Sequence, residues 1–82
     1  MKFILVGPQG EKSYSIESLH VETGAGALVI KAGHAPLITT LRAPSTIDFT
    51  LTSGEQQSLQ LTRTAFLEIS RTKVIALVNQ TS

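Results

Sequence analysis

The sequence predicts an all-β domain, a small two-sheet β-sandwich or flattened barrel of short antiparallel strands. Of its 82 residues, 22 are β-branched (five Val, seven Ile and ten Thr), and side chains that are stiff at χ1 favour strands over helices. Apolar residues alternate with polar ones in several short segments, which is typical of half-buried strands. No segment shows the sustained periodicity of an amphipathic helix.

Length and composition indicate one globular domain that spans residues 1–82. The chain is 41% hydrophobic and 16% charged, a profile typical of folded rather than disordered proteins. A chain of this size buries only about 60% of its unfolded surface, so it forms no second core.

The charged residues and the missing cysteines exclude several classes of function. Seven basic and six acidic residues are scattered along the chain and give a net charge of +1. There is no basic block, so we expect no nucleic-acid partner. The absence of cysteine excludes disulfides and thiolate sites and fits a reducing compartment.

We expect no targeting or membrane signal at the start of this sequence. Phe3–Val6 is a continuous apolar run that ends at the turn Gly7-Pro8-Gln9-Gly10. It is too short for a signal peptide or a membrane span. We expect it to form a strand buried on both faces.

The remaining strands follow with turn residues between them. Tyr14 and Ile16, and then Leu19 and Val21, alternate with polar residues and predict two half-buried segments. Pro44 ends a later strand because it has no backbone N–H to donate. Further strands are expected at 27–30, 37–41, 47–51, 59–61, 66–69 and 74–78, a hairpin loop at 52–55, a turn at 70–72 and a frayed end at 79–82. Eight or nine short strands predict a sandwich or barrel.

Two glycine-containing segments resemble nucleotide-binding loops only superficially. In Gly7–Ser13, Glu11 separates the second glycine from Lys12, and a strand follows where a phosphate loop requires a helix. Gly24 and Gly26 form half of a dinucleotide fingerprint, but Val29 occupies the third glycine position. We therefore expect no cofactor, and we interpret the second segment as a hairpin tip that can dock on another protein.

His20 and His34 are the two imidazoles of the chain. A zinc site needs three or four suitably spaced ligands, and the sequence shows no such cluster. Hydrolysis through His34 would need a serine or threonine and a carboxylate in a cleft, and no motif such as G-x-S-x-G is present. The sequence predicts no metal site, no catalytic residue and no enzymatic activity.

The segment around His34 also predicts a structural corner. Pro36 pushes Ala35 into an extended conformation, and Gly33 permits an unusual backbone angle. His34 then lies where the chain bends, with its imidazole hydrogen-bonded to neighbouring backbone.

Gly33-His34-Ala35-Pro36-Leu37 resembles the Gly-His-Ala-Pro-Leu segment of the epsilon chain of F-type ATP synthases. The resemblance covers nearly the whole chain in the same order. Gly7-Pro8-Gln9-Gly10 is similar to the family's early Thr-Pro-x-Gly turn, and residues 24–28 fall at its Gly-rich tip. Residues 66–69 are similar to its Phe-Leu-Glu-Val strand. Departures are Ala27, Val29, Ala32, Pro44-Ser45 and Thr64-Ala65, which leave the strand pattern intact.

The resemblance implies a β-sandwich that belongs to the central stalk, or rotor, of an ATP synthase. Such a subunit binds the gamma chain and the polar loops of the membrane-embedded c-ring, and it couples proton-driven ring rotation to ATP synthesis without performing chemistry. It implies a location on the cytoplasmic face of the bacterial inner membrane, peripheral through the complex and without direct insertion. In most members two C-terminal helices that can inhibit ATP hydrolysis follow this domain. We expect that regulation to be missing here if the protein ends naturally at Ser82; the alternative is that the sequence is part of a longer protein that carries the helices.

By the same resemblance, two groups of residues would lie near the ring, and one exposed face would meet gamma. The ring-side residues would be the tip Gly24, Ala25, Gly26 and Ala27 and the corner residues Lys31 and His34. The sequence does not identify the gamma face, but docking predicts a sizeable exposed apolar patch. The alternative is a free-standing ligand-binding or adaptor β-sandwich, which would show a deep apolar pocket with convergent polar groups and no patch.

Overall fold

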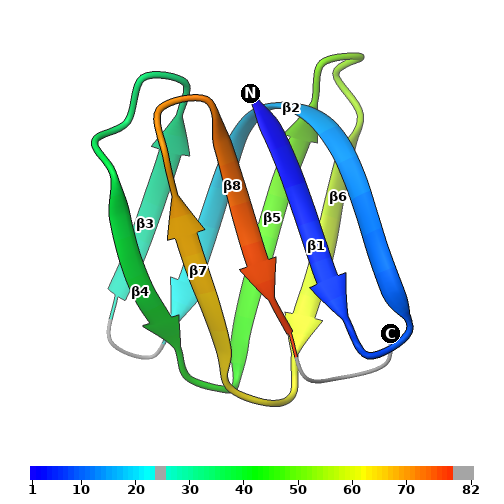
Figure 1. Ribbon diagram of the computed structural model, residues 1–82, viewed down its shortest axis with the longest axis vertical. Coiled ribbons are helices and arrows are strands. Elements are labelled where there is room, and N and C mark those ends of the chain that lie inside the picture. Colours follow the sequence, from blue (N-terminus) through cyan, green and yellow to red (C-terminus); the bar gives the residue numbers. More distant parts are fainter. Residues whose placement is uncertain (24–25, 79–82) are drawn as a thin grey trace.

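The computed structural model describes residues 1–23 and 26–78, and its regular structure consists of eight β-strands without a helix (Figure 1). The predicted all-β fold is confirmed. The end at 79–82 and the tip residues 24–25 lie outside the described residues. The strands are β1 (Lys2–Gly7), β2 (Gly10–Thr23), β3 (Gly26–Lys31), β4 (Leu37–Leu41), β5 (Ser45–Leu51), β6 (Gln56–Leu61), β7 (Ala65–Ile69) and β8 (Lys73–Leu77).

The strands form two packed layers that share β2. One layer has the order β4-β7-β8-β1-β2, and the other has the order β3-β2-β5-β6. The first half of β2 pairs with β1, and its second half lies between β3 and β5. Figure 1 shows β4, β7, β8 and β1 in front of β3, β5 and β6, as expected for a sandwich.

The two segments predicted around Tyr14 and Val21 are parts of one strand of 14 residues. The prediction that they are separate segments was therefore wrong. The pairing of β2 with β5 shifts register between Ile16 and Ser18. A bulge of this kind inserts one residue and reverses the phase of the side chains without ending the strand. Ile16 on one side of the bulge and Leu19 on the other are therefore both buried.

One strand pair departs from the predicted antiparallel arrangement. β1 and β8 run parallel, with Lys2 opposite Lys73 and Val6 opposite Leu77. Hairpins force neighbouring strands to be antiparallel, but β1 and β8 come from the two ends of the sequence and are joined by no hairpin. Their relative direction is therefore set by the order in which the strands pair in the sheet.

Three aromatic rings lie in the core between the layers. The ring of Phe49 lies 5.0 Å from that of Phe3 in an edge-on arrangement and 5.0 Å from that of Tyr14. Such aromatic contacts add to the stabilisation from buried apolar area. The buried apolar residues are Phe3, Ile16, Leu19, Val21, Ile30, Leu41, Ile47, Phe49, Leu61, Ala65, Leu67, Ile69, Val74 and Ala76.

Phe3→Ala should lower the free energy of unfolding by about 3–5 kcal/mol, because Phe3 is fully buried. That is a large share of the about 5–15 kcal/mol that a domain has in total. Phe66→Ala is the matched control, because Phe66 is 54% exposed, and its free energy of unfolding should change little. Urea denaturation followed by circular dichroism measures both. Equal losses in the two variants would contradict the assignment of Phe3 to the core.

Candidate binding surfaces

The outward surface of the β4-β7-β8-β1 layer carries a cluster of apolar side chains, with the exposed Glu68 among them. In one row across it, Phe66 lies opposite Leu77, and Leu77 lies opposite Val6. Phe66 is 54% and Leu77 47% exposed, and Ile38 on β4 is 76% exposed. We call this surface the apolar outer face; its apolar members are Ile4, Val6, Ile38, Phe66, Ile75 and Leu77, and Thr40 and Glu68 lie among them.

The outward surface of the β3-β2-β5-β6 layer is polar. His20 lies opposite Asp48, and Asp48 lies opposite Ser58, whose hydroxyl donates to Asp48 Oδ1 at 2.5 Å. The row ends at Val29 on β3, a large apolar side chain that is 51% exposed. We call this surface the polar outer face; its other members include Ser18, Glu22, Thr46, Thr50 and Gln56.

The first strand is buried on one face only, contrary to the prediction for Phe3–Val6. Phe3 is fully buried, whereas Ile4 and Val6 are half-buried on the apolar outer face. One side of this continuous apolar run therefore faces the core, and the other side faces outward and is not fully covered by the chain itself. The predicted exposed apolar patch is present.

The corner between β3 and β4 is a hydrogen-bonded turn. Gly33 has φ +85°, a conformation that L side chains avoid. Its N–H donates to the Arg71 carbonyl at 3.0 Å, and the His34 N–H donates to the Lys31 carbonyl at 3.1 Å. The His34 Nδ1–H donates to the Ala35 carbonyl at 2.7 Å, so the predicted bond between imidazole and backbone is present. Pro36 is exposed and directly precedes β4.

The structure places the described residues among those proposed for the ring toward opposite ends of β3. Gly26 and Ala27 begin the strand, whereas Lys31 ends it and His34 follows in the corner (Figure 1). Four strand steps separate Ala27 from Lys31, which is roughly 13 Å. Since β3 pairs only with β2 among the described strands, both ends can face one partner if the edge of β3 lies along it.

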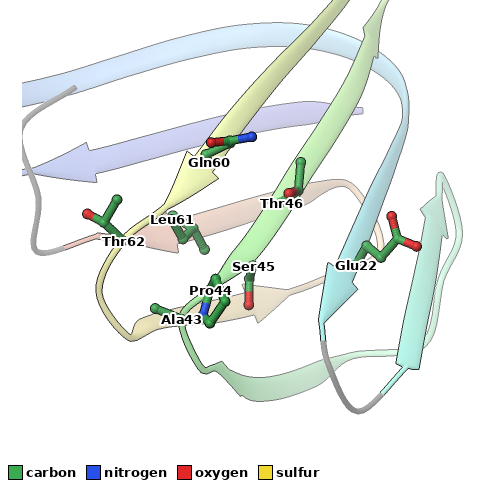
Figure 2. A pocket seen from close by; sticks show the side chains of 8 residues that line it. All are labelled: Glu22, Ala43, Pro44, Ser45, Thr46, Gln60, Leu61 and Thr62. Carbon is green, nitrogen blue, oxygen red and sulfur yellow. The ribbon is translucent and has the colours of Figure 1, made fainter.

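A wide hollow of about 700 Å³ opens beside the start of β5 and the end of β6. Figure 2 shows Glu22 on β2 well apart from Gln60 and Thr62 on the other side of the hollow. The hydroxyl of Ser45, another lining residue, donates to the Arg42 carbonyl. Glu22 is the one carboxylate in the lining, so the hollow offers no pair of groups for acid–base chemistry.

The two histidines do not form a joint site. His20 lies on the polar outer face and His34 in the corner. Residues 1–23 and 26–78 contain no group of three or more His, Asp or Glu side chains that could hold a metal ion. In the same residues no helix is long and apolar enough to cross a membrane.

Two curled sheets with one apolar and one polar outer face define a small all-β sandwich domain. The sequence of residues 1–82 matches the family described as "ATP synthase, Delta/Epsilon chain, beta-sandwich domain", and the chain belongs to this family. The resemblance seen in the Gly-His-Ala-Pro-Leu segment is thereby confirmed. No curated protein matches the sequence closely enough to count as a relative.

Two solved structures show the same fold. A chain in the central stalk and c-ring of the Tetrahymena thermophila mitochondrial ATP synthase matches 98% of this chain, with 14% identity and a TM-score of 0.79. A chain of the Euglena gracilis mitochondrial ATP synthase, in an OSCP/F1/c-ring structure, matches 95% with 16% identity and a TM-score of 0.82. This chain spans 63% and 49% of the length of those two chains.

Gly33→Ala should lower the free energy of unfolding by about 1–2 kcal/mol, because an L side chain is strained at positive φ. The space around a Cβ at this position is open, so the loss would come from the backbone alone. His34→Ala, which removes one hydrogen bond at a partly exposed site, should cost less than about 1 kcal/mol. Urea denaturation compares the two; a larger loss in the histidine variant would assign the corner's stability to the imidazole.

Proposed function

We propose that this chain is a central-stalk, or rotor, subunit of an F-type ATP synthase. It binds the gamma chain and the c-ring, couples proton-driven rotation to ATP synthesis, and performs no catalysis itself. The observation that carries this proposal is the apolar outer face on a domain of the ATP synthase delta/epsilon family. A small domain that works alone has no use for such a face in water.

The gamma chain covers the apolar outer face in this proposal. Phe66 lies within the surface, between Thr40 on β4 and Leu77 on β8, and central aromatic side chains commonly dominate binding energy. Ile4 and Val6 on β1 are half-buried, although they belong to a continuous apolar run that is typical of a strand buried on both faces. A partner that binds the apolar outer face would bury their exposed side.

The alternative ligand-binding domain has less support. It would need a deep apolar pocket with convergent polar groups, but the hollow at Ser45 is wide and has one carboxylate in its lining. Hydrolysis through His34 has less support too. A catalytic triad hydrogen-bonds the histidine Nδ1 to a carboxylate, whereas His34 Nδ1 bonds the Ala35 carbonyl.

The c-ring contact runs along the free edge of β3 in this proposal. This arrangement lets the tip (Gly24 to Ala27) and the corner residues Lys31 and His34 face the ring together. It leaves the apolar outer face, which belongs to the other layer, open to gamma. The domain is then held at the cytoplasmic face of the bacterial inner membrane through its protein partners, without inserting into the lipid.

Phe66→Ala should weaken binding to the gamma chain of the same enzyme by about 2 kcal/mol, or roughly 30-fold in Kd, as for a central aromatic residue. Val29→Ala is the matched control, because Val29 is similarly exposed at 51% but lies on the polar outer face. Isothermal titration calorimetry measures both affinities. The proposal fails if the unmodified chain does not bind gamma, and the choice of face fails if Val29→Ala has the larger effect.

Single-cysteine variants test the ring contact cleanly, because the chain has no native cysteine. Ala27→Cys and Lys31→Cys should both cross-link to c-ring loops that carry cysteines in the assembled enzyme. Ser58→Cys on β6, at the far edge of the same layer, should not. Cross-linking from only one of the two β3 positions would mean that the sandwich stands on end, with the edge of β3 away from the ring.

A further inference from the structure

We infer that the partner covering the apolar outer face also adds a β-strand to the edge of β4, paired with the backbone of Ile38 and Thr40. This inference rests on the proposed function, because the added strand belongs to the gamma chain. It specifies how the two proteins join: through main-chain hydrogen bonds as well as through side-chain burial. β-strand addition is a general mode of recognition at exposed sheet edges.

The direction of the backbone groups of β7 follows from one hydrogen bond. The Ser70 N–H donates to the Lys73 carbonyl at 2.9 Å, so residues 70, 68 and 66 direct their N–H and C=O groups toward β8. Groups alternate along an antiparallel strand, and those of residues 65, 67 and 69 therefore point toward β4. The pairing of β8 with β1 is consistent with this assignment. The Val78 N–H donates to the Val6 carbonyl of β1 at 2.8 Å, so alternate residues of β8 bond to β1 and the others bond to β7.

The same alternation determines which groups of β4 remain on its edge. Leu37, Thr39 and Leu41 lie opposite residues 69, 67 and 65, so their N–H and C=O groups bond to β7. The groups of Ile38 and Thr40 point the other way. Among the described strands, none pairs with β4 on that side. The edge thus presents two N–H donors and two C=O acceptors at the spacing of a strand.

Within Leu37–Leu41 this edge lacks the features that prevent strand addition, although Pro36 and Arg42 flank it. Natural sheets protect their edges with charged residues, prolines and bulges, but β4 reads Leu-Ile-Thr-Thr-Leu and pairs with β7 without a register shift. Ile38, which is 76% exposed, belongs to the apolar outer face. A strand added here would continue that face. By contrast, the edge of β6 is rich in Gln and Ser and borders the polar outer face.

A hollow beside β4 favours the same occupant. It has a volume of about 290 Å³ and lies between β3 and β4; its lining residues are Val21, Gly26, Ala27, Leu28, Thr39, Thr40 and Leu41. Side chains of an added strand alternate between the two sides of the sheet. One set would lie beside Ile38, and the other would point into the hollow.

The chemistry of the added segment follows from these neighbours. We expect an extended stretch of gamma with apolar side chains at alternating positions, where it pairs with Ile38 and Thr40. Arg42 is exposed directly after β4, so a carboxylate on the segment at that end would be favourable. Of the residues proposed for the ring, Gly26 and Ala27 line the hollow beside β4, whereas Lys31 and His34 at the other end of β3 do not.

Amide hydrogen exchange measured by NMR tests the pairing directly. In the isolated chain, the N–H groups of Ile38 and Thr40 should exchange rapidly, whereas those of Thr39 and Leu41 are protected by β7. Binding of gamma should slow exchange at Ile38 and Thr40 by more than about tenfold, because they enter a hydrogen-bonded ladder. Unchanged exchange at both residues in the complex would overturn the inference.

Thr40→Pro tests the same pairing by binding. It removes the outward N–H without removing a hydrogen bond from the β4–β7 ladder, and proline is tolerated on edge strands with this orientation. Binding to gamma should weaken at least about tenfold. The matched control is Ser58→Pro on the edge of β6. Ser58 also points its N–H outward, because the Leu51 N–H donates to the Glu55 carbonyl and so directs residues 57, 59 and 61 toward β5.

Thr40→Lys provides a second variant that keeps the backbone N–H, in case the proline disturbs folding. A lysine on the edge should weaken strand addition, and circular dichroism should show an intact fold.

If both Thr40 variants bind gamma normally while Phe66→Ala binds weakly, strand addition is wrong and the proposed function stands. If the unmodified chain does not bind gamma, both fail. If Ile38 and Thr40 become protected with rising concentration of this chain alone, the occupant is a second copy, which also overturns the inference.

Discussion

The fold depends on β2 belonging to both layers. A chain of 82 residues has little apolar material, and two sheets that share a strand can close over a single core. The register shift between Ile16 and Ser18 makes this possible, since it lets the strand turn from one layer to the other while its apolar side chains stay inside. The rings of Phe3, Tyr14 and Phe49 then join β1, β2 and β5 around one point.

The two outer faces differ in polarity, and this difference is informative because the chain has few apolar residues. One layer covers its outer side with Ser, Thr, Asp, His and Gln, as an antiparallel sheet in water usually does. The other places Phe66 and Leu77 outward. Apolar side chains in these positions add nothing to the core, and they raise the risk of self-association. Their presence is intelligible if another protein covers them.

The sequence predicts those features of the fold that short segments determine. Alternation identifies β5 through Ile47, Phe49 and Leu51, and the corner conformation at Gly33 and His34 follows from residues that are neighbours in the chain. The long β2 was divided because a bulge breaks the alternation just as a turn does. The parallel pairing of β1 with β8 was missed because nothing local to either strand encodes a partner some 70 residues away.

The candidate surfaces were predictable to different degrees. The apolar runs at 3–6 and 74–78 indicate strands that are buried on both faces. The pattern does not distinguish burial within the chain from burial against a partner. The tip and the corner are close in sequence, yet β3 is extended between them and holds them apart. The free backbone groups of Ile38 and Thr40 could not be predicted, because they depend on the pairing order of four strands.

The parallel pairing of β1 with β8 has a mechanical consequence. The chain enters the sheet at the start of β1 and leaves it at the far end of β8 (Figure 1). Hydrogen bonds run between the two strands from Lys2 N–H to the Thr72 carbonyl at one end and from Val78 N–H to the Val6 carbonyl at the other. A pulling force between the two strands' outer ends acts along them and strains every bond of the ladder at once. Such a sheet yields by shearing, which resists far more force than peeling its bonds apart in succession.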